Sequence, residues 1–264
     1  MRAARAVPLG HKSSHWDPMD LKEQAATADP EIRPLDSTFM WRVFYAFGAL
    51  ALLSVAISIG GKWLGKSIAM AGHTDDTTVR EIVIGNNLIS APANAIRFER
   101  DRRDGVANRL DLYLHWPDMR GYSAGLRNDF NNVGGVRRII FLSLEERMMS
   151  RDMSGRFDPI YRSLIVPKGK AGPSGIGLFD FNEKSGYMNE LLAVAARPGR
   201  EPFVARCLTG PSAEESLAPC ERDIHVGNDL SLTYRFPFEL LTDWKALDQA
   251  VEGQARKLIK SGKS

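Results

Sequence analysis

The sequence predicts a mainly β domain, an antiparallel sandwich or barrel-like fold with a C-terminal amphipathic helix, preceded by a single transmembrane helix. Three observations lead to this fold class. Residues 43–61 contain no charged side chain, residues 73 onward alternate mostly with period two between Gly- and Pro-rich turns, and only residues 240–258 repeat at helical spacing. We therefore expect a disordered tail over 1–40, a spanning helix over 41–64 and a β-rich domain over 73–264.

The uncharged stretch is framed by residues typical of a membrane boundary. Arg42 and Lys62 flank it, and Trp41 and Trp63 stand just outside. In a helix the two tryptophans would lie roughly 33 Å apart, close to the ~30 Å hydrocarbon core of a bilayer. Indole rings and adjacent cations anchor spanning helices at both interfaces. The alternative is a buried helix of a soluble protein. It does not explain why about 19 residues contain no charge and no polar stripe.

The segment before this stretch contains four prolines, six basic and six acidic residues, and few large apolar ones. No helical or strand period persists there, so we expect disorder. The apolar stretch begins some 40 residues into the chain and is too long for the core of a cleaved signal peptide. An uncleaved signal-anchor fits better.

The orientation of the span depends on the cysteines, because the basic residues on its two sides are nearly balanced. Cys207 and Cys220 are the only cysteines and enclose a turn-rich loop containing Gly210, Pro211 and Pro219. A disulfide there would imply an oxidising compartment; two unrelated buried thiols in a cytosolic domain are the alternative. We favour the disulfide, and with it a cytoplasmic N-terminus and an exported domain, which in a bacterium means the inner membrane and the periplasm.

About seven to nine short strands are expected in the domain, without the long alternating helices of a parallel α/β sheet. Residues 110–116 form the clearest half-buried strand, with Leu110, Leu112 and Leu114 on one face and His115 on the other. A three-residue turn at 227–229 predicts a hairpin. The other expected strands cover residues 79–84, 87–98 (interrupted by Pro92), 139–144, 177–181, 191–196, 203–208, 222–226 and 230–236.

The final segment has helical period, with Leu240, Trp244, Leu247, Val251, Ala255 and Leu258 at steps of three and four. Thr242 or Asp243 is placed to cap its N-terminus, and Lys257 and Lys260 would fall in its last turn. We expect its apolar face to lie on the β-sheet. Residues 168–177 are expected to form a mobile loop.

The charge balance argues against a nucleic-acid partner. From His73 onward the domain has 27 Lys and Arg against 26 Asp and Glu, a net charge of +1. The arginine-rich segment 97–109 is interpreted as a solvated hairpin with self-paired charges, or alternatively as an edge that docks lipid head groups or an acidic partner. In the span, Ala56 and Gly60 form a small-xxx-small pair that would permit a homo-oligomer.

Residues 60–67 match G-x-x-x-x-G-K-S, the phosphate-binding P-loop, in which glycines let backbone amides wrap a phosphate. A P-loop must follow a strand of a parallel sheet, whereas a membrane-length apolar segment precedes this one. An interfacial helix end is the preferred interpretation, and ATP binding lost on Lys66→Ala is what the alternative predicts. We expect no cofactor.

Residues 121–125 fit G-x-S-x-G, the pattern of the nucleophile elbow, with Ser123 at its centre and Asp180 and His225 following in triad order. The elbow requires a strand that ends at its first glycine, and residues 117–120 intervene. A strong helix should also follow, but residues 128–135 are typical of turns. A membrane-anchored serine hydrolase using Ser123 is therefore the alternative function, and we expect no catalytic residues.

Metal ligation is poorly supported, because the domain histidines His73, His115 and His225 have no partner at helical spacing and no CxxC pair exists. His11 and His15 in the tail are interpreted as solvated. The favoured function is a single-pass membrane protein that exposes a non-catalytic β domain outside the cytoplasm and binds another envelope protein or a ligand, as an accessory or assembly subunit. The lipid bilayer would contact residues 41–64.

Overall fold

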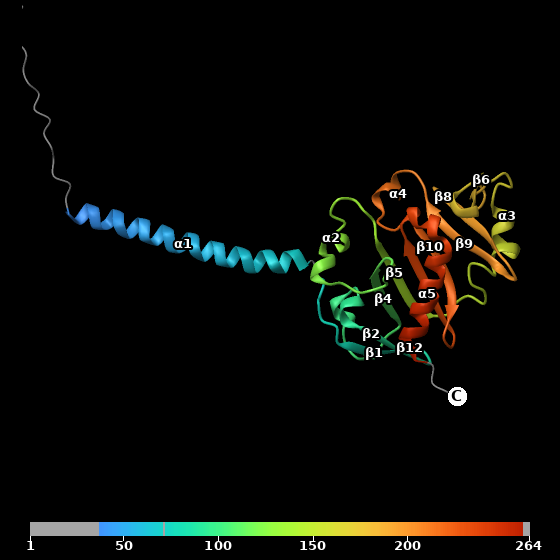
Figure 1. Cartoon of the computed structure of the whole chain (residues 1–264), viewed down its shortest axis with the longest axis horizontal. Coiled ribbons are helices and arrows are strands. Elements are labelled where there is room, and N and C mark those ends of the chain that lie inside the picture. The colour runs from blue at the N-terminus through green and yellow to red at the C-terminus, as the bar shows by residue number, and fades with distance from the viewer. Residues whose placement is uncertain (1–36, 71, 261–264) are drawn as a thin grey trace, which may run out of the picture. The chain divides into compact units, whose positions relative to one another are not determined.

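A computed structural model describes the backbone of residues 37–70 and 72–260 (Figure 1). Residues 1–36, with His11 and His15, lie outside the described part. The last four residues of the tail predicted to be disordered, 37–40, are helical. The chain divides into two compact units, Met1–Ile59 and Gly60–Ser264.

The first unit contains most of a long helix, α1 (Ser37–Met70). Its segment Ser37–Ile59 has a mean hydropathy of 1.9 and no buried residues in its most apolar window, so by length and composition it could cross a membrane. Trp41, at the start, is exposed and contacts the rings of Phe44 and Tyr45. Lys62 and Trp63 lie where only the backbone is described.

The helical backbone of α1 continues through residues 60–67. In an α-helix each N–H donates to the carbonyl four residues earlier. These amides are therefore not free to wrap a phosphate, and the P-loop interpretation of this segment is wrong.

The second unit is built on an open sheet of eight strands, all antiparallel, in the order β4-β5-β11-β10-β9-β8-β7-β6. The outermost strands do not pair with each other, so the mainly β, antiparallel prediction is confirmed but no barrel closes. The strands are β4 (Arg109–His115), β5 (Ile139–Glu146), β6 (Lys170–Ala171), β7 (Gly177–Asp180), β8 (Glu190–Arg197), β9 (Arg200–Leu208), β10 (Cys220–Val226) and β11 (Leu230–Phe236).

A second sheet of four strands has the order β12-β2-β1-β3, in which β3 is parallel to β1. The buried side chain of Asn87 exchanges two 2.7 Å hydrogen bonds with the backbone of Asn228, which joins this sheet to the β10–β11 turn. The strands are β1 (Val79–Ile84), β2 (Asn87–Pro92), β3 (Gly105–Val106) and β12 (Ile259–Lys260).

The helices of the domain are short except for the last, α5. Its presence confirms the predicted C-terminal helix. They are α2 (Arg127–Phe130), α3 (Arg162–Leu164), α4 (Pro211–Glu215) and α5 (Trp244–Leu258), with 3₁₀ turns η1 (Ala93–Ala95), η2 (Glu99–Asp101), η3 (Ala124–Leu126), η5 (Pro173–Gly175) and η6 (Phe238–Asp243) and a π turn η4 (Phe157–Tyr161). Asp243 occupies the N-cap of α5 but makes no side-chain cap bond. Lys260 lies in β12, beyond the helix.

One face of the large sheet forms the main core. Leu112 and Leu142 of the large sheet, Ile82 and Ile89 of the small sheet and Val251 of α5 belong to the same buried cluster. The apolar face of α5 therefore lies on the sheet, as its periodicity predicted. Residues 168–177 also lie against this helix end, because Ser174 donates to the Thr242 carbonyl and Trp244 Nε1 donates to the Ser174 carbonyl. The loop is thus anchored at its middle.

A buried polar cluster interrupts this core. Asp248 of α5 accepts hydrogen bonds from Arg222 at 3.1 Å, Arg197 at 2.8 Å and the Tyr234 hydroxyl at 2.8 Å. Arg222 is 1% exposed and also donates to Ser154 and to the Val204 carbonyl. Asp248 therefore balances the fully buried Arg222 and the partly buried Arg197, which come from two different strands.

Loss of the Asp248 charge is expected to destabilise the fold strongly. In Asp248→Asn the shape is kept, but Arg222 and Arg197 lose their counter-charge, which costs about 3 kcal/mol in the free energy of unfolding. Glu252→Gln, one turn later and paired with Arg200 near the surface, should cost less than about 1 kcal/mol. Urea unfolding of the full chain in detergent measures the free energy of unfolding of both variants. Equal decreases would show that the buried cluster stabilises the fold no more than a surface ion pair does.

Candidate functional site

The second face of the large sheet is covered only at its two ends. At the β4–β5 end, Tyr122 and Phe130 pack on Tyr113 and Ile139. At the other end, Met153, Tyr161 and Ile165 pack on Leu192 and Val204. Between the two covers, polar side chains of β5, β10 and β11 remain partly exposed. This uncovered strip is the candidate site.

Three adjoining hollows make the strip a continuous groove, which we call the sheet-face groove. Their volumes are about 390, 370 and 220 Å³. The first and second share Arg97 and Phe141 as lining residues, and the second and third share Glu145, Glu221 and Thr233. The groove therefore crosses the strands of the sheet.

Strand register places one row of side chains along this groove. Tyr113 pairs with Phe141, Phe141 with Arg235, Arg235 with Glu221, Glu221 with Arg206 and Arg206 with Leu192. Directly paired residues point to the same face of a sheet. The row thus begins with aromatic rings, passes through alternating charges and ends at an apolar cluster.

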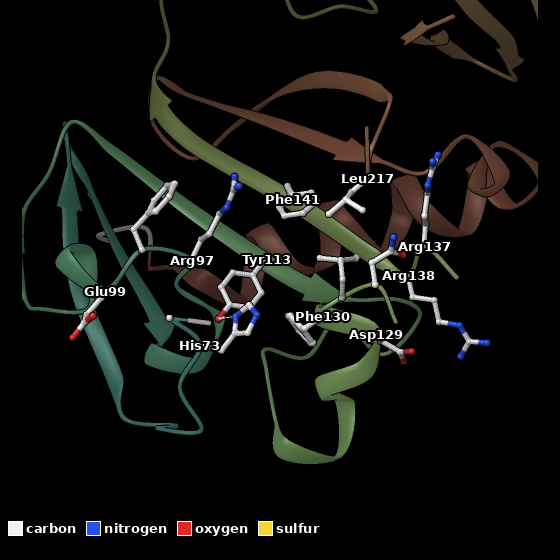
Figure 2. Close-up of a pocket in the computed structure, with 14 residues that line it drawn as sticks. His73, Arg97, Glu99, Tyr113, Asp129, Phe130, Arg137, Arg138, Phe141 and Leu217 are labelled. Carbon is white, nitrogen blue, oxygen red and sulfur yellow. Dashed lines mark hydrogen bonds between the residues drawn. The ribbon is translucent and has the colours of Figure 1, made fainter. Parts of the chain in front are cut away.

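The first hollow, the aromatic pocket, has rings on five of its fourteen lining residues (Figure 2). His73 Nδ1 lies 3.1 Å from the Tyr113 hydroxyl, and its ring stacks on Tyr122 with centroids 4.8 Å apart. Phe130 meets Tyr113 edge to face at 5.0 Å. Phe141 and Leu217 close the opposite side in Figure 2. Interlocked rings give this pocket a preformed apolar wall.

The segment between β4 and β5 holds these rings in place through close backbone contacts. Gly121 packs against the backbone of Asn94 and Ala95, where a Cβ atom would lie 2.7 Å from three backbone atoms. Tyr122 N donates to the Asn94 carbonyl, and Asn94 Nδ2 donates to the Tyr122 carbonyl. A side chain at Gly121 would therefore displace Tyr122, on which the pocket residue His73 stacks.

Buried His115 fixes the same segment. Its Nδ1 lies 2.8 Å from Asp118, and its Nε2 lies 2.9 Å from Asp129 in α2. Burial disfavours the ionised Asp118, but hydrogen bonds from His115 and Arg120 outweigh this effect and lower its pKa. His115 was expected on a polar, ordinarily solvated or hydrogen-bonded face; it is hydrogen-bonded, but buried beneath residues 116–130.

Four arginines at this end of the groove have no carboxylate partner within the described part of the chain. Arg97 lies over the Phe98 and Phe141 rings at 5.0 Å from each centroid. Arg137 and Arg235 donate to backbone carbonyls of residues 213–218, and Arg138 extends outward (Figure 2). Such guanidinium groups are suited to bidentate binding of carboxylates.

The other charges of the aromatic pocket do not cancel these arginines. Asp129 is already hydrogen-bonded to His115, and Glu99 points away from the rings in Figure 2. Burial lowers the pKa of His73, with a smaller contribution from Arg102, against the raising effect of a bond with Asn131. His73 is thus neutral at pH 7, and the pocket has a net positive rim.

The far end of the groove has balanced charge and exposed thioethers. Arg206 pairs with Glu221, and Arg156 pairs with Asp223. Burial raises the pKa of Asp223 despite the opposing effect of Arg156. Met148 and Met149 lie at the rim, 89% and 58% exposed.

Cys207 and Cys220, paired across β9 and β10, form the disulfide that the sequence favoured. The loop that it closes includes α4 and Leu217, which lines the aromatic pocket. Arg137 donates to the carbonyls of Ala213 and Glu214 in the same loop. The bridge therefore supports one wall of the candidate site, a role that the spacing alone did not indicate.

The elbow hypothesis for Ser123 receives no support from the geometry. Ser123 is exposed at the start of η3, followed by a helix of only four residues. Asp180 on β7 pairs with Lys170, and His225 lies on β10. No hydrogen bond joins these three side chains among the described residues, and Gly121 is explained by its close packing.

The segment 97–109 is not the hairpin that was expected. It forms η2 and then β3, parallel to β1, and Arg102 donates to the carbonyls of Gly72, Ile96 and Arg97. Arg97 itself enters the groove. In the described ranges, no cluster of three or more His, Cys, Asp or Glu side chains is arranged to hold a metal ion.

Comparison of the sequence with protein-family profiles and with curated proteins finds no match. Two solved structures are similar to the chain. Each match covers 70% of this chain and 94% of the chain in the solved structure. One is an immunity protein of the Stenotrophomonas maltophilia type IV secretion system, with 16% identity and a TM-score of 0.43. The other is the Neisseria meningitidis iron-regulated outer membrane lipoprotein FrpD, with 9% identity and a TM-score of 0.41. At these values neither likeness supports an inference about this chain's function.

His73 should make the domain less stable in mild acid. Its folded pKa lies below the ordinary value of about 6.5, so below pH 6.5 the unfolded state binds a proton that the folded state excludes. The stability present above pH 6.5 is then lost as the pH falls. His73→Phe keeps a ring but cannot titrate. Thermal unfolding at pH 7.5 and 5.0 should show wild type losing more stability than this variant; parallel losses would contradict the assignment.

Proposed function

We propose that this chain is a single-pass membrane protein that exposes a non-catalytic, β-rich binding domain outside the cytoplasm and binds another envelope protein. It would act as an accessory or assembly subunit of the inner membrane, with its N-terminus cytoplasmic. The observation that supports this most is the sheet-face groove, which combines a preformed aromatic pocket with four arginines that have no carboxylate partner among the described residues.

The anchor in this proposal is α1. Its segment Ser37–Ile59 is long and apolar enough to span a bilayer, and Trp41 lies near its start, where tryptophan favours the interface. The disulfide favours an oxidising compartment for the domain. Together these features support an exported domain tethered by its N-terminal side.

The groove has the character of a protein interface more than of an active site. Its rings and arginines are the residue types enriched at interface hot spots. Its central carboxylates Glu221 and Asp223 are occupied by Arg206 and Arg156. Ser143, on the groove floor, donates to the carboxylate of Asp111, and the hollow that it lines contains no histidine or lysine among the described residues. Recognition therefore accounts for these side chains better than nucleophilic catalysis.

Topology is the first test. A C-terminal fusion to alkaline phosphatase, which folds only outside the cytoplasm, should be active, and a fusion to a cytoplasm-only fluorescent protein should be dark. The reverse pattern would contradict the exported domain. In the exported protein, Cys207→Ser should remove a mobility difference between reduced and unreduced samples on denaturing gels.

A photo-crosslinker placed in the groove should capture one partner in the native cell. Benzoylphenylalanine at Leu217, on the aromatic pocket, should give a discrete adduct. The same group at Val106, which is 85% exposed on β3 of the other sheet, should give none. Equal adducts at both positions would refute a groove-specific partner, and an adduct of twice the chain mass would identify a second copy of this chain.

A further inference from the structure

We propose that the sheet-face groove binds an extended segment of the partner protein in which a large apolar side chain is flanked by carboxylates. This inference rests on the proposed function and specifies its ligand. It draws on three independent properties of the groove: its length, its apolar pocket and the asymmetry of its charge.

The length of the groove fits a short extended peptide. The row from Tyr113 to Leu192 crosses β4, β5, β11, β10, β9 and β8. Five inter-strand spacings of about 4.8 Å span roughly 24 Å, which an extended chain covers with about seven residues at 3.4 Å each. Such a segment would lie across the strands and use its side chains for contact.

The alternative binding mode, addition of a partner strand to an edge of the large sheet, is disfavoured by both of its edge strands. The outer edge of β4 already receives the bridge between Ile96 and Leu112 and a bond from Arg97 N to the Asp111 carbonyl. The opposite edge strand, β6, has only two residues. The face, with its hollows, is therefore the favoured contact surface of the large sheet.

The aromatic pocket supplies the anchor point. Its volume of about 390 Å³ exceeds that of one large side chain, and Phe98, Tyr113, Phe130 and Phe141 give it apolar walls. Leu217 at its mouth is 43% exposed. An aromatic or large aliphatic side chain entering here would exclude water from rings that are now partly solvated.

The charges around that pocket favour acidic side chains beside the apolar anchor residue of the bound peptide. Arg97 lies on one side of the rings, and Arg137 and Arg138 lie on the other (Figure 2). Arg235 follows Phe141 in the row. With His73 neutral and Asp129 already occupied by His115, carboxylates on both sides of the anchor would meet guanidinium groups that have no carboxylate partner among the described residues.

The other half of the groove disfavours a polyanion. Four carboxylates line or adjoin it. Glu190 and Glu221 pair with Arg206, Asp223 pairs with Arg156, and Glu145 pairs with Arg109. A nucleic-acid backbone laid along the row would meet these carboxylates. A free amphipathic anion would fill only the pocket and leave the remaining row unused. A peptide with acids at one end and neutral residues at the other matches both halves.

Selection from a random heptapeptide phage library tests this ligand directly, with the full-length protein in biotinylated nanodiscs and empty nanodiscs as background. We expect enriched peptides to carry Phe, Trp or Leu next to Asp or Glu. For a synthetic peptide of the enriched sequence, Arg97→Gln combined with Arg138→Gln should weaken binding at least tenfold. Arg103→Gln is the matched control, because this exposed arginine lies near Arg97 in sequence but lines a different hollow.

Each other outcome overturns the inference in a distinct way. Enrichment of basic or uncharged peptides would mean that the arginines do not select the ligand. Absence of enriched peptides, with octanoate retained by wild type but not by the double variant, would assign the pocket to a free amphipathic anion. In both cases an adduct specific to Leu217 in cells would leave the proposed function standing. Loss of that adduct, with peptide binding intact, would instead reject the function alone.

Discussion

The arrangement of the domain depends on one buried carboxylate, Asp248. It receives Arg222 from β10, Arg197 from β8 and the hydroxyl of Tyr234 from β11, so a single side chain of α5 joins three strands. Burial lowers the pKa of Arg222, but Tyr234 and Asp248 outweigh burial and keep it above its ordinary value. Ser154 bonds both arginines and the Pro202 carbonyl. The cluster therefore also positions the segment around Ser154, whose neighbour Met153 covers the far end of the groove.

This arrangement gives the two faces of the large sheet different roles. The core face carries most of the large buried aliphatic side chains together with α5 and the small sheet, so the fold does not need the second face to be fully covered. The second face can leave its centre polar because Glu221 with Arg206, and Asp223 with Arg156, neutralise one another across or beside the strands. Stability and recognition are thus separated onto opposite sides of one sheet. The groove can therefore hold arginines that have no carboxylate partner among the described residues at little cost to folding.

Local patterns predicted the elements well and their surroundings poorly. Strict alternation located β1, β11 and the β10–β11 hairpin almost to the residue, and the spacing of Leu247, Val251 and Leu258 located α5. The same alternation predicted that Tyr113 and His115 face solvent. A period of two shows on which face of the sheet a side chain lies, but not whether another segment covers that face. Their cover comes from residues 116–130, through the Gly121 contact that resembled an elbow motif. Asp248 was missed for a similar reason, since its partners lie on strands distant in sequence.

The disulfide links the compartment of the protein to the state of its site. Closing a loop of this size removes conformational entropy from the unfolded chain, worth about 3 kcal/mol in the loop-closure model, but its position has a second effect. The loop between Cys207 and Cys220 holds Leu217 at the pocket and the carbonyls that orient Arg137 and Arg235. A reduced chain could keep its core, which rests on Asp248 and the aliphatic layers, while this loop loosened. Under the proposed function, the binding surface would then be complete only where the bridge can form, so that export and the ability to bind are coupled through one covalent bond.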